Sequence, residues 1–458
     1  MKFKVPHTLV LLFLLMILSL VATWIVPSGA FDTLPTESGI DVVEPGSFQT
    51  FDEKEYLPVT SLLTVVPRAF ADAQGIIFFV LIIGGALAVV RETGAIDAIL
   101  GKLIERYGAS PGPLLFFMMF AFAAASATLG MAEEYIPFAI ILVSLSAALR
   151  FDAITAIGTM VVGYSIGYGI AITNPFTLII AQDIVGLPPT SGMGYRIVVF
   201  VPLLAIGFHH VWSYAAKIRK DPSEGLLYGL EVPDISREIT DYPPVTLRRQ
   251  LVLILTLLVL IGIVIGIATQ GWYLVELGGT FLGLAIVTGL ISGIGTNRTA
   301  KIFGNGAAEL ASTALLIGFA RSVGLIMEDG EILHTVVHAV STPLAGVGSE
   351  IAAVGMLLVQ SALNFFIPSG SGQAIVSMPL MAPIGDIVGL TRQTTVLAFQ
   401  LGDGLMNMVV PTNPVLMGIL GLAGIPYEKW FRFILPLIIK LLVTCSIILI
   451  LGVWIGYS

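Results

Sequence analysis

The sequence predicts an all-α polytopic membrane protein made of inverted repeats, and three observations lead to that prediction. The 458 residues are 56% hydrophobic and only 11% charged, with a mean hydropathy of +0.96, whereas soluble domains carry about 25% charged residues. Apolar runs of membrane-spanning length recur along the chain, and two halves of the chain carry matching motifs. This composition excludes a soluble enzyme and a disordered scaffold. The formal net charge of −8 also argues against a nucleic-acid partner.

Several apolar runs are as long as a membrane-spanning helix, which needs about 20 residues. They cover residues 7–27, 71–91, 196–216, 250–269, 278–295, 303–327 and 433–456. Two longer runs, 153–185 and 393–423, are each interrupted in the middle. The apolar arms within 113–149 and 351–389 are mostly shorter than a full span, so we expect two re-entrant hairpins. The alternative is that all the arms cross the membrane and the tips are surface loops.

Lysine and arginine residues, which favour the cytoplasmic side, orient these spans. Lys2 and Lys4 place the N-terminus in the cytoplasm, and the loop 217–249, which begins and ends with basic clusters, lies on the same side. Residues 28–60 hold seven acids and one base, so we expect them outside. The last span then leaves the C-terminus external. We therefore expect a multi-pass protein of the plasma (inner) membrane, embedded in the lipid bilayer.

An internal repeat is the most informative feature of the sequence. Residues 173–175, Thr-Asn-Pro, recur as Thr-Asn-Pro at residues 412–414, 239 positions further on. The span that opens the first copy, 71–91, runs inward by the charge rule, and its counterpart, 303–327, runs outward. Inverted repeats with interrupted helices are typical of secondary transporters. The predicted parts are a first helix with an acidic external loop (1–60), repeat 1 (61–216), a cytoplasmic loop (217–249), linking helices (250–299) and repeat 2 (300–458).

Each Thr-Asn-Pro motif interrupts an apolar run. Proline lacks an amide hydrogen and disturbs the preceding helical turn, so carbonyls there lose their partners, which is costly in hydrocarbon. Such carbonyls and the Thr and Asn oxygens can hold a small hard cation, and the following half-helix presents its N-terminus to an anion. We therefore take Thr173, Asn174, Thr412 and Asn413 as candidate ligands, with Na+ at both breaks. An ordinary proline kink is the alternative.

The two hairpin tips and the second broken run carry further polar residues. The second tip is small and polar, and its free amide groups suit a carboxylate. The candidate residues there are Ser369, Gly370, Ser371, Gly372 and Gln373. At the same place in the first copy stand Glu133 and Glu134, two acids that are costly in a membrane unless paired or protonated. Asp403 and Asn407 share one helix face at i, i+4 spacing, and we take Asp403 as a proton or cation site. Asn364 is a weaker candidate.

No enzymatic activity is expected. Residues 163–167, Gly-Tyr-Ser-Ile-Gly, match the serine-hydrolase elbow, which needs a strand-to-helix turn, but this glycine spacing fits close helix packing better. His334 and His338 have metal-compatible spacing, but no third ligand is suggested. Arg321 and Lys440 lie in spans and are expected to be structural, Arg321 by snorkelling or by pairing with an acid. The sequence lacks a P-loop, which argues against ATP-driven transport, and no cofactor is expected.

Four motifs together resemble the YfcC/DcuC group of anaerobic carriers within the ion-transporter superfamily, over nearly the whole chain. They are residues 130–134 (Gly-Met-Ala-Glu-Glu), 173–176 (Thr-Asn-Pro-Phe), 368–374 (Pro-Ser-Gly-Ser-Gly-Gln-Ala) and 411–414 (Pro-Thr-Asn-Pro). The resemblance implies a homodimer whose protomers each have a scaffold and a mobile transport domain, with elevator-type alternating access. Better-known superfamily members carry Ser-Asn-Thr at both tips, and this chain differs from them at Glu133 and Glu134.

The resemblance implies a transporter of basic amino acids, with arginine/ornithine-type exchange, or of C4-dicarboxylates and related carboxylates. The residues favour amino acids. Glu133, Glu134 and Asp403 supply negative charge for an ammonium or guanidinium group, and the Ser/Gly tip supplies a carboxylate site. A Na+- or H+-coupled C4-dicarboxylate transporter is the alternative, and a channel is a more distant one. The coupling ion, Na+ or H+, and the choice between symport and antiport stay open.

Overall fold

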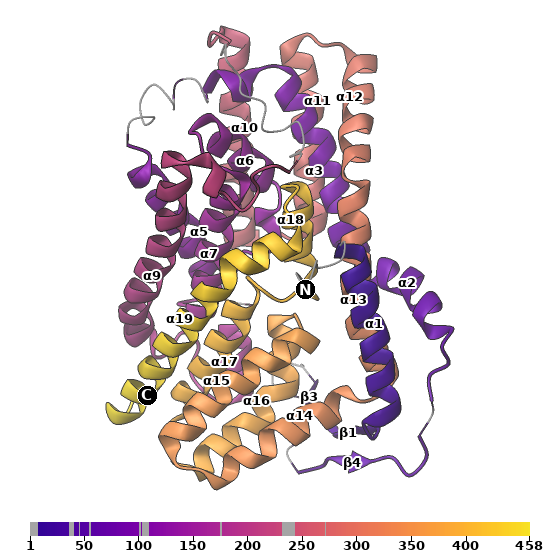
Figure 1. The fold of residues 1–458 in the computed structure, drawn as a ribbon, viewed down its shortest axis with the longest axis vertical. Coiled ribbons are helices and arrows are strands. Elements are labelled where there is room, and N and C mark those ends of the chain that lie inside the picture. The colour runs from indigo at the N-terminus through magenta and orange to yellow at the C-terminus, as the bar shows by residue number, and fades with distance from the viewer. Residues whose placement is uncertain are drawn as a thin grey trace.

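The computed structural model describes residues 8–35, 41–44, 46–54, 56–99, 102, 110–174, 176–230, 243–270 and 272–458. These residues are helical nearly throughout, with two short two-stranded sheets among them (Figure 1). Eight of the described helices are long and apolar enough to cross a membrane. The prediction of an all-α chain with many membrane spans is therefore confirmed. Lys2, Lys4, Pro175 and part of the predicted cytoplasmic loop, 231–242, lie outside the described residues.

The N-terminal part is one apolar helix followed by an extended strap. α1 (Thr8–Ile25) leads into β1 (Gly29–Ala30) and β2 (Thr33–Pro35). β1 pairs antiparallel with β4 (Gln49–Thr50), and β2 pairs antiparallel with β3 (Asp41–Val43). The strap runs along the lower end of the molecule in Figure 1.

The helices of the first half begin and end where local chemistry dictates. They are α2 (Ser61–Asp72), α3 (Gln74–Glu92), α5 (Gly112–Leu129), η1 (Glu133–Tyr135), α6 (Phe138–Ala148), α7 (Ala153–Ile170), α8 (Leu178–Ile184), α9 (Met193–Lys220) and η2 (Pro222–Glu224). Asp152 caps α7 by accepting the amide of Thr155 at 2.9 Å, which satisfies one of the free amides of the first turn. Gly130 ends α5 in the left-handed conformation, with φ 72°.

The second half has a closely similar order of helices. They are α10 (Leu247–Gln270), α11 (Leu274–Ser292), α12 (Thr296–Glu309), α13 (Ala311–Asp329), α14 (Leu333–Ser341), η4 (Thr342–Gly346), α15 (Ser349–Phe366), α16 (Gly370–Ile387), α17 (Arg392–Met406), α18 (Pro414–Leu422) and α19 (Tyr427–Trp454). The expected span 303–327 is divided between α12 and α13, which meet at Leu310. The expected span covers only apolar residues, whereas α12 begins seven residues earlier, among polar side chains.

α7 forms the centre of the molecule, because every one of its 18 residues is buried. It packs against α5, α9 and α17. Small residues allow this close approach: a Cβ built on Gly167 would lie 2.0 Å from the carbonyl oxygen of Ala123 in α5. Gly404 of α17 meets Gly169 of α7 in the same way, at 2.3 Å. The glycines of residues 163–167 therefore serve helix packing, as predicted, and Ser165 lies inside a helix rather than at an elbow.

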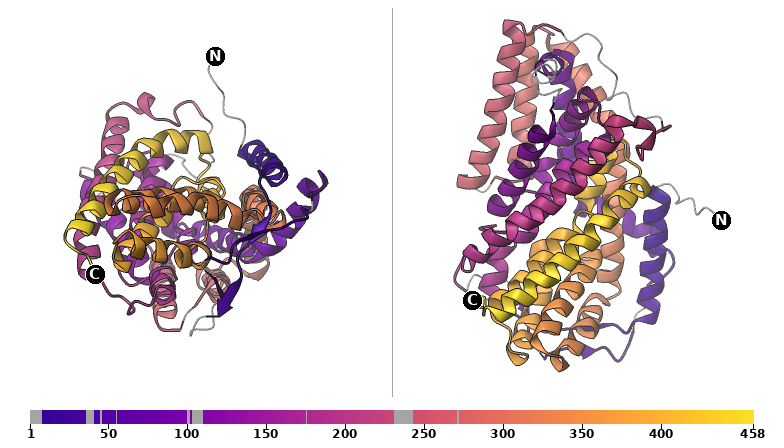
Figure 2. Two further views of the ribbon diagram at one scale, coloured as in Figure 1. Left: turned by 90° about the horizontal axis from the view of Figure 1, so that it is seen from below. Right: turned by 60° about the vertical axis from the view of Figure 1, so that its left-hand side comes forward.

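Two antiparallel helix pairs stand beside this centre. α3 packs along α12 and α2 along α13, with α11 also against α3. Gly84 and Gly306 let the first pair touch, since a Cβ on Gly306 would lie 2.6 Å from the Gly84 oxygen. On another face, α9 and α19 run obliquely side by side (Figure 2, right).

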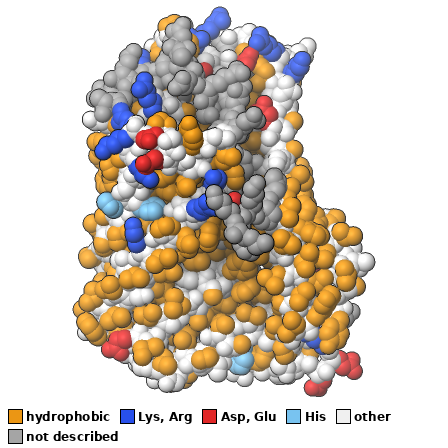
Figure 3. All heavy atoms as spheres, viewed as in Figure 1, with side chains coloured by type: hydrophobic (Ala, Val, Ile, Leu, Met, Phe, Trp, Pro, Cys, Tyr) orange, Lys and Arg blue, Asp and Glu red, His pale blue; other side chains and the backbone are white. Residues whose placement is uncertain are grey.

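The outer surface is strongly apolar. Hydrophobic side chains dominate the lower two thirds of the face in Figure 3, whereas many of the lysines and arginines gather toward its upper end. Long helices carry large exposed apolar residues, among them Ile254, Leu257 and Leu258 of α10 and Ile439 and Val443 of α19. Such a surface belongs in lipid, where helices satisfy their own backbone groups. The chain is therefore a multi-span membrane protein.

His334 and His338 have a structural place on α14. The Nδ1 of His334 accepts the amide of Phe31 at 3.2 Å, and the ring of His338 stacks on Phe48 at 4.3 Å. These contacts fasten the N-terminal strap to α14. The described residues include no group of three or more His, Cys, Asp or Glu side chains that could hold a metal.

Candidate substrate cavity

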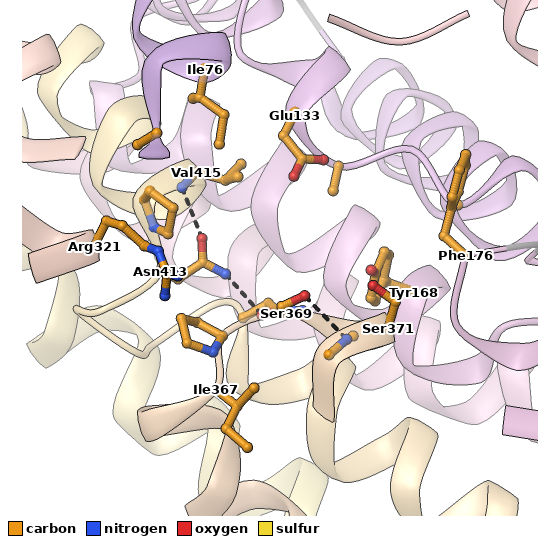
Figure 4. A pocket seen from close by; sticks show the side chains of 18 of the residues that line it. Ile76, Glu133, Tyr168, Phe176, Arg321, Ile367, Ser369, Ser371, Asn413 and Val415 are labelled. Carbon is orange, nitrogen blue, oxygen red and sulfur yellow. Dashed lines mark hydrogen bonds between the residues drawn. The ribbon is translucent and has the colours of Figure 1, made fainter. Parts of the chain in front are cut away.

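A cavity of about 630 Å³ lies between three parts of the chain (Figure 4). They are the η1 turn between α5 and α6, the turn at the start of α16, and the second helix break between α17 and α18. Its volume lies within the range of small-molecule sites, about 300–1,000 Å³. The wall holds four carboxylates, one arginine, three tyrosines, two asparagines and the turn that precedes α16. These residues are Asp72, Glu133, Glu134, Glu328, Arg321, Tyr164, Tyr168, Tyr273, Asn407, Asn413, Ser369, Gly370, Ser371 and Gly372.

Glu133 and Glu134 stand on η1, in the turn between α5 and α6. Glu134 is buried, and its Oε2 accepts the amide of Ala132 at 2.8 Å. Glu133 lies across the cavity from Ser369 and Ser371 (Figure 4). In the part of the chain that the structure describes, no lysine or arginine forms an ion pair with either glutamate. Two adjacent acids therefore face a cavity without a protein cation to balance them.

The first break contributes Phe176 to the cavity wall, whereas Thr173 and Asn174 lie behind that wall. Thr173 is tied to the end of α5, because its Oγ1 donates to the Thr128 carbonyl at 3.0 Å. Asn174 Oδ1 accepts the amides of Phe176 at 2.8 Å and of Thr177 at 3.2 Å, in the turn that leads into α8. The same oxygen sits against Gly130, where a Cβ would come within 2.4 Å of it. Thr173 and Asn174 thus shape the wall from behind.

The second break repeats both bonds. Thr412 Oγ1 donates to the Phe365 carbonyl at 2.6 Å, near the end of α15. Asn413 Oδ1 accepts the amide of Val415 at 2.9 Å and caps α18. Its Nδ2 donates to Asn407 Oδ1 at 2.8 Å. Asn407 and Asn413 line the cavity, whereas Thr412 is buried outside its wall.

The turn before α16 brings backbone amides to the cavity. Ser369 caps the helix, and its Oγ accepts the amide of Gly372 at 3.3 Å. The first amides of a helix have no intrahelical acceptor, so this turn presents donors to the cavity. Gln373 does not line the cavity; its Nε2 donates to Gln360 Oε1 at 2.7 Å.

Asp403 lies immediately behind this turn and is fully buried. Asn364 Nδ2 donates to Asp403 Oδ1 at 2.7 Å. Asp403 Oδ2 and Asn364 Oδ1 are both buried and have no hydrogen-bond partner among the described residues. A Cβ built on Gly370 would lie 3.0 Å from Asp403 Oδ2 and 2.9 Å from the Tyr168 hydroxyl. Four groups from α7, α15, α16 and α17 therefore meet at one point, one residue layer from the cavity.

Several wall residues were not predicted from the sequence. Arg321 pairs with Asp72 and, at 3.0 Å, with Glu328. Its predicted pairing with an acid is confirmed, but its place in the cavity wall was missed. Tyr273, just before α11, hydrogen-bonds Glu133. Nothing in the local sequence around these residues marks them, because helices distant in the chain bring them together.

Tyr164 and Tyr168 could have been found from the repeat. The offset of the Thr-Asn-Pro motifs places them opposite Asp403 and Asn407. Both tyrosines line the cavity. The repeat alignment therefore indicates both tyrosines as site residues, whereas their residue type alone does not.

An all-helical membrane protein whose spans enclose a polar cavity belongs to the class of membrane transporters. A family model described as "C4-dicarboxylate anaerobic carrier" (DcuC) matches residues 5–454. The chain therefore belongs to the DcuC family, and the resemblance drawn from its motifs is confirmed. This is a family of secondary carriers.

Two relatives match almost end to end. One, from Escherichia coli (strain K12), bears the name "Putative basic amino acid antiporter YfcC"; it is 34% identical over 100% of this chain and 98% of that protein. The other is an uncharacterized protein of Haemophilus influenzae, 28% identical over 98% of this chain and 97% of that protein.

Two solved transporter structures align with most of the chain. The YdaH transporter of Alcanivorax borkumensis is 17% identical with a TM-score of 0.42, covering 98% of this chain and 99% of that chain. MtrF of Neisseria gonorrhoeae is 16% identical with a TM-score of 0.42, covering 99% and 96%.

Proposed function

We propose that the protein is a secondary active transporter that exchanges small charged metabolites, with basic amino acids as its substrate class. One observation carries this proposal: four carboxylates and a single arginine line a cavity that also receives the amides of the turn before α16. The name of the Escherichia coli relative supports the same class.

The charges divide the cavity into two sides. Arg321 is already paired with Asp72 and Glu328, so Glu133 and Glu134 are the acids left for a substrate. A buried acid in a membrane protein is costly unless paired or protonated, and an ammonium or guanidinium group would offset that cost. The Ser/Gly turn lies across the cavity from Glu133 (Figure 4) and suits the α-carboxylate. A basic amino acid spans both sides.

We propose alternating access between two inverted repeats. Helix lengths support this: α5 and α15 each have 18 residues, α3 and α13 each have 19, and α9 and α19 each have 28. Gly163 approaches α5 and Gly402 approaches α15, at matching positions. The paired Thr and Asn bonds at the two breaks support it as well. An elevator motion of the hairpins and broken helices against α2, α3, α11, α12 and α13, in a homodimer, is proposed from the family resemblance.

The coupling ion has two candidate places. Asp403 Oδ2 and Asn364 Oδ1, both without a partner among the described residues, would accept a proton on Asp403 or a Na+ between them. The carbonyls around the two Thr-Asn-Pro motifs are the other candidate Na+ ligands. At these motifs the Asn174 and Asn413 oxygens already accept two backbone amides each, which favours the Asp403 site.

A C4-dicarboxylate is the second candidate substrate, favoured by the description of the family model. Arg321 and the turn before α16 would provide positive partners for two carboxylates. This substrate would need Glu133 and Glu134 protonated or turned away, since both face the same cavity.

Counterflow in proteoliposomes distinguishes a transporter of basic amino acids from a transporter of C4-dicarboxylates, and both from a channel. Vesicles would be loaded with unlabelled arginine or ornithine, or with succinate, and the uptake of the labelled compound would be followed with and without Na+. Saturable counterflow of a basic amino acid supports the proposal. Counterflow of succinate alone would assign the dicarboxylate function. Uptake that neither saturates nor responds to the internal compound would indicate a channel and contradict both transport proposals.

A further inference from the structure

Arg196 and Trp430 hold equivalent places in the two halves. Each is the fourth residue of a 28-residue helix, α9 or α19, that follows a helix break. They are the two largest side chains that the structure buries completely among the described residues. Large residues at matched, fully buried positions suggest a common task.

That task is to donate hydrogen bonds to the backbone carbonyls that have no intrahelical partner at the end of a central helix. Arg196 Nη1 donates to the carbonyl of Ile170, the last residue of α7, at 3.2 Å. Trp430 Nε1 donates to the carbonyl of Met408, just beyond α17, at 2.8 Å. Tyr427 adds a bond to the next carbonyl, that of Val409, at 2.6 Å. The last carbonyls of a helix have no intrahelical donor, and inside a membrane protein each needs one.

The two residues differ in charge. A neutral indole does this work in the second half, so a hydrogen bond alone does not require a cation. Arg196 nevertheless brings a guanidinium. Its Nε and Nη2 have no hydrogen-bond partner of good geometry among the described residues, and the neutral Tyr457 hydroxyl stands beside it. No described acid forms an ion pair with it. What favours the charge is the negative end of the α7 dipole, which the Ile170 carbonyl terminates.

Where α17 of the second half crosses α7 of the first half, the second half carries a negative charge. α7 and α17 touch at Gly169 and Gly404. Next to Gly404 stands Asp403, fully buried with one free oxygen, and its counterpart in α7 is the neutral Tyr164. A positive charge therefore belongs to the first break, and a negative charge to the second.

We propose that Arg196 is a built-in cation of the first break, standing where a small coupling cation would otherwise bind, so that ion coupling is confined to the second half. This inference rests on the proposed transport function, which it deepens by assigning the coupling site to one repeat. Arg196 acts through the end of α7 and is a positioning residue.

Charge and hydrogen bonding are separated by two substitutions. Arg196→Lys keeps the charge, and Arg196→Gln keeps a donor without charge. We expect Arg196→Lys to retain counterflow within about threefold of the parent, and Arg196→Gln to lose about tenfold or more in Na+-free buffer. Adding Na+ should restore Arg196→Gln, because the vacated place then accepts a cation. Trp430→Phe, the matched control, removes a neutral donor and should gain no Na+ dependence.

A binding measurement makes the test independent of transport. Melting temperatures of the purified detergent-solubilised proteins would be compared in NaCl and in choline chloride. Na+ should raise the melting temperature of Arg196→Gln by several degrees more than that of the parent protein. Equal shifts, or full activity of Arg196→Gln without Na+, would overturn the proposal. Absence of counterflow in the parent would instead contradict the transport function and leave the melting comparison to decide on Arg196.

Discussion

The two helix breaks share their scaffold bonds but differ in what they place beside the substrate cavity. At both breaks a threonine ties the chain to the preceding hairpin arm, and an asparagine oxygen accepts two backbone amides just after it. Both breaks reach the cavity wall among the described residues, but the first does so through the apolar Phe176 and the second through the polar Asn407 and Asn413.

This comparison teaches that a repeated motif need not be a repeated site. The bonds common to both copies are those that any broken helix in a membrane requires, since its freed donors and acceptors must be satisfied. What differs is chemistry: Glu133 and Glu134 at the first turn against a Ser/Gly turn at the second, and Tyr164 against Asp403. Function is to be sought in these differences.

The largest expected effect tests the difference between the turns. Replacing Glu133 and Glu134 together by glutamine should abolish counterflow of basic amino acids, a loss of at least about 100-fold, because a buried cationic substrate would lose its charge partners. The measurement is initial uptake in proteoliposomes, with monodispersity checked by size-exclusion chromatography. Glu53→Gln, which removes an exposed acid far from the cavity, is the matched control. Full activity of the double variant would end the acidic-site proposal.

Asp403 provides the next test. Asp403→Asn keeps the shape of the side chain and the neighbourhood of Asn364, but removes the negative charge. We expect a loss of about tenfold in uptake driven by an ion gradient, because the free oxygen next to Gly370 would no longer attract a proton or Na+. Substrate exchange measured with equal ion concentrations on the two sides of the membrane should fall less. Tyr164→Phe is the comparison from the first half and should not change the ion dependence. If both variants lose the gradient response equally, the asymmetry between the halves is wrong.

Much of the architecture was predictable because lipid imposes simple rules on sequence. Long apolar runs mark the spans, and Asn-Pro pairs mark the breaks, since proline removes an amide donor and asparagine before it supplies an acceptor for the amides that follow. The proposed equivalence of the two copies rests on spacing. The division of the 303–327 run at Leu310 did not, because α12 contains polar residues that a search for apolar runs passes over.

The site was only partly predictable, for a different reason. Glu133, Glu134 and residues 369–372 were found because acids and small polar residues are conspicuous in an apolar sequence. Asp72, Tyr273 and Arg321 reach the cavity through helix packing, which one-dimensional spacing does not encode. The roles of Asn174 and Asn413 were ambiguous, since an Asn before a short helix suits both a cation ligand and a cap.

The two asparagines after the threonines give a smaller, paired effect. Asn174→Ala and Asn413→Ala should each cost about 1 kcal/mol of stability, because each side chain accepts two backbone amides that would lose their acceptor. Both should lower the melting temperature by a similar amount. Only Asn413→Ala should also raise the KM for substrate, since Asn413 lines the cavity and holds Asn407 through a 2.8 Å bond. A KM change in Asn174→Ala of the same size would mean that the first break also contacts substrate.

The smallest expected effect distinguishes a threonine hydroxyl that only tethers the helix break from one that binds an ion. Thr173→Val and Thr412→Val keep the shape of each side chain and remove one hydroxyl, so each loses a bond worth about 1 kcal/mol. Thr412→Val should cost more stability than Thr173→Val, because Thr412 is buried, so water is poorly placed to replace the lost donor to the Phe365 carbonyl. Melting temperature and Na+ dependence of uptake would be measured on both variants. If the hydroxyls only tether the breaks, the concentration of Na+ for half-maximal uptake stays unchanged in both. If Thr412 binds Na+, that concentration rises in Thr412→Val alone, and the coupling ion would belong at the second break rather than at Asp403.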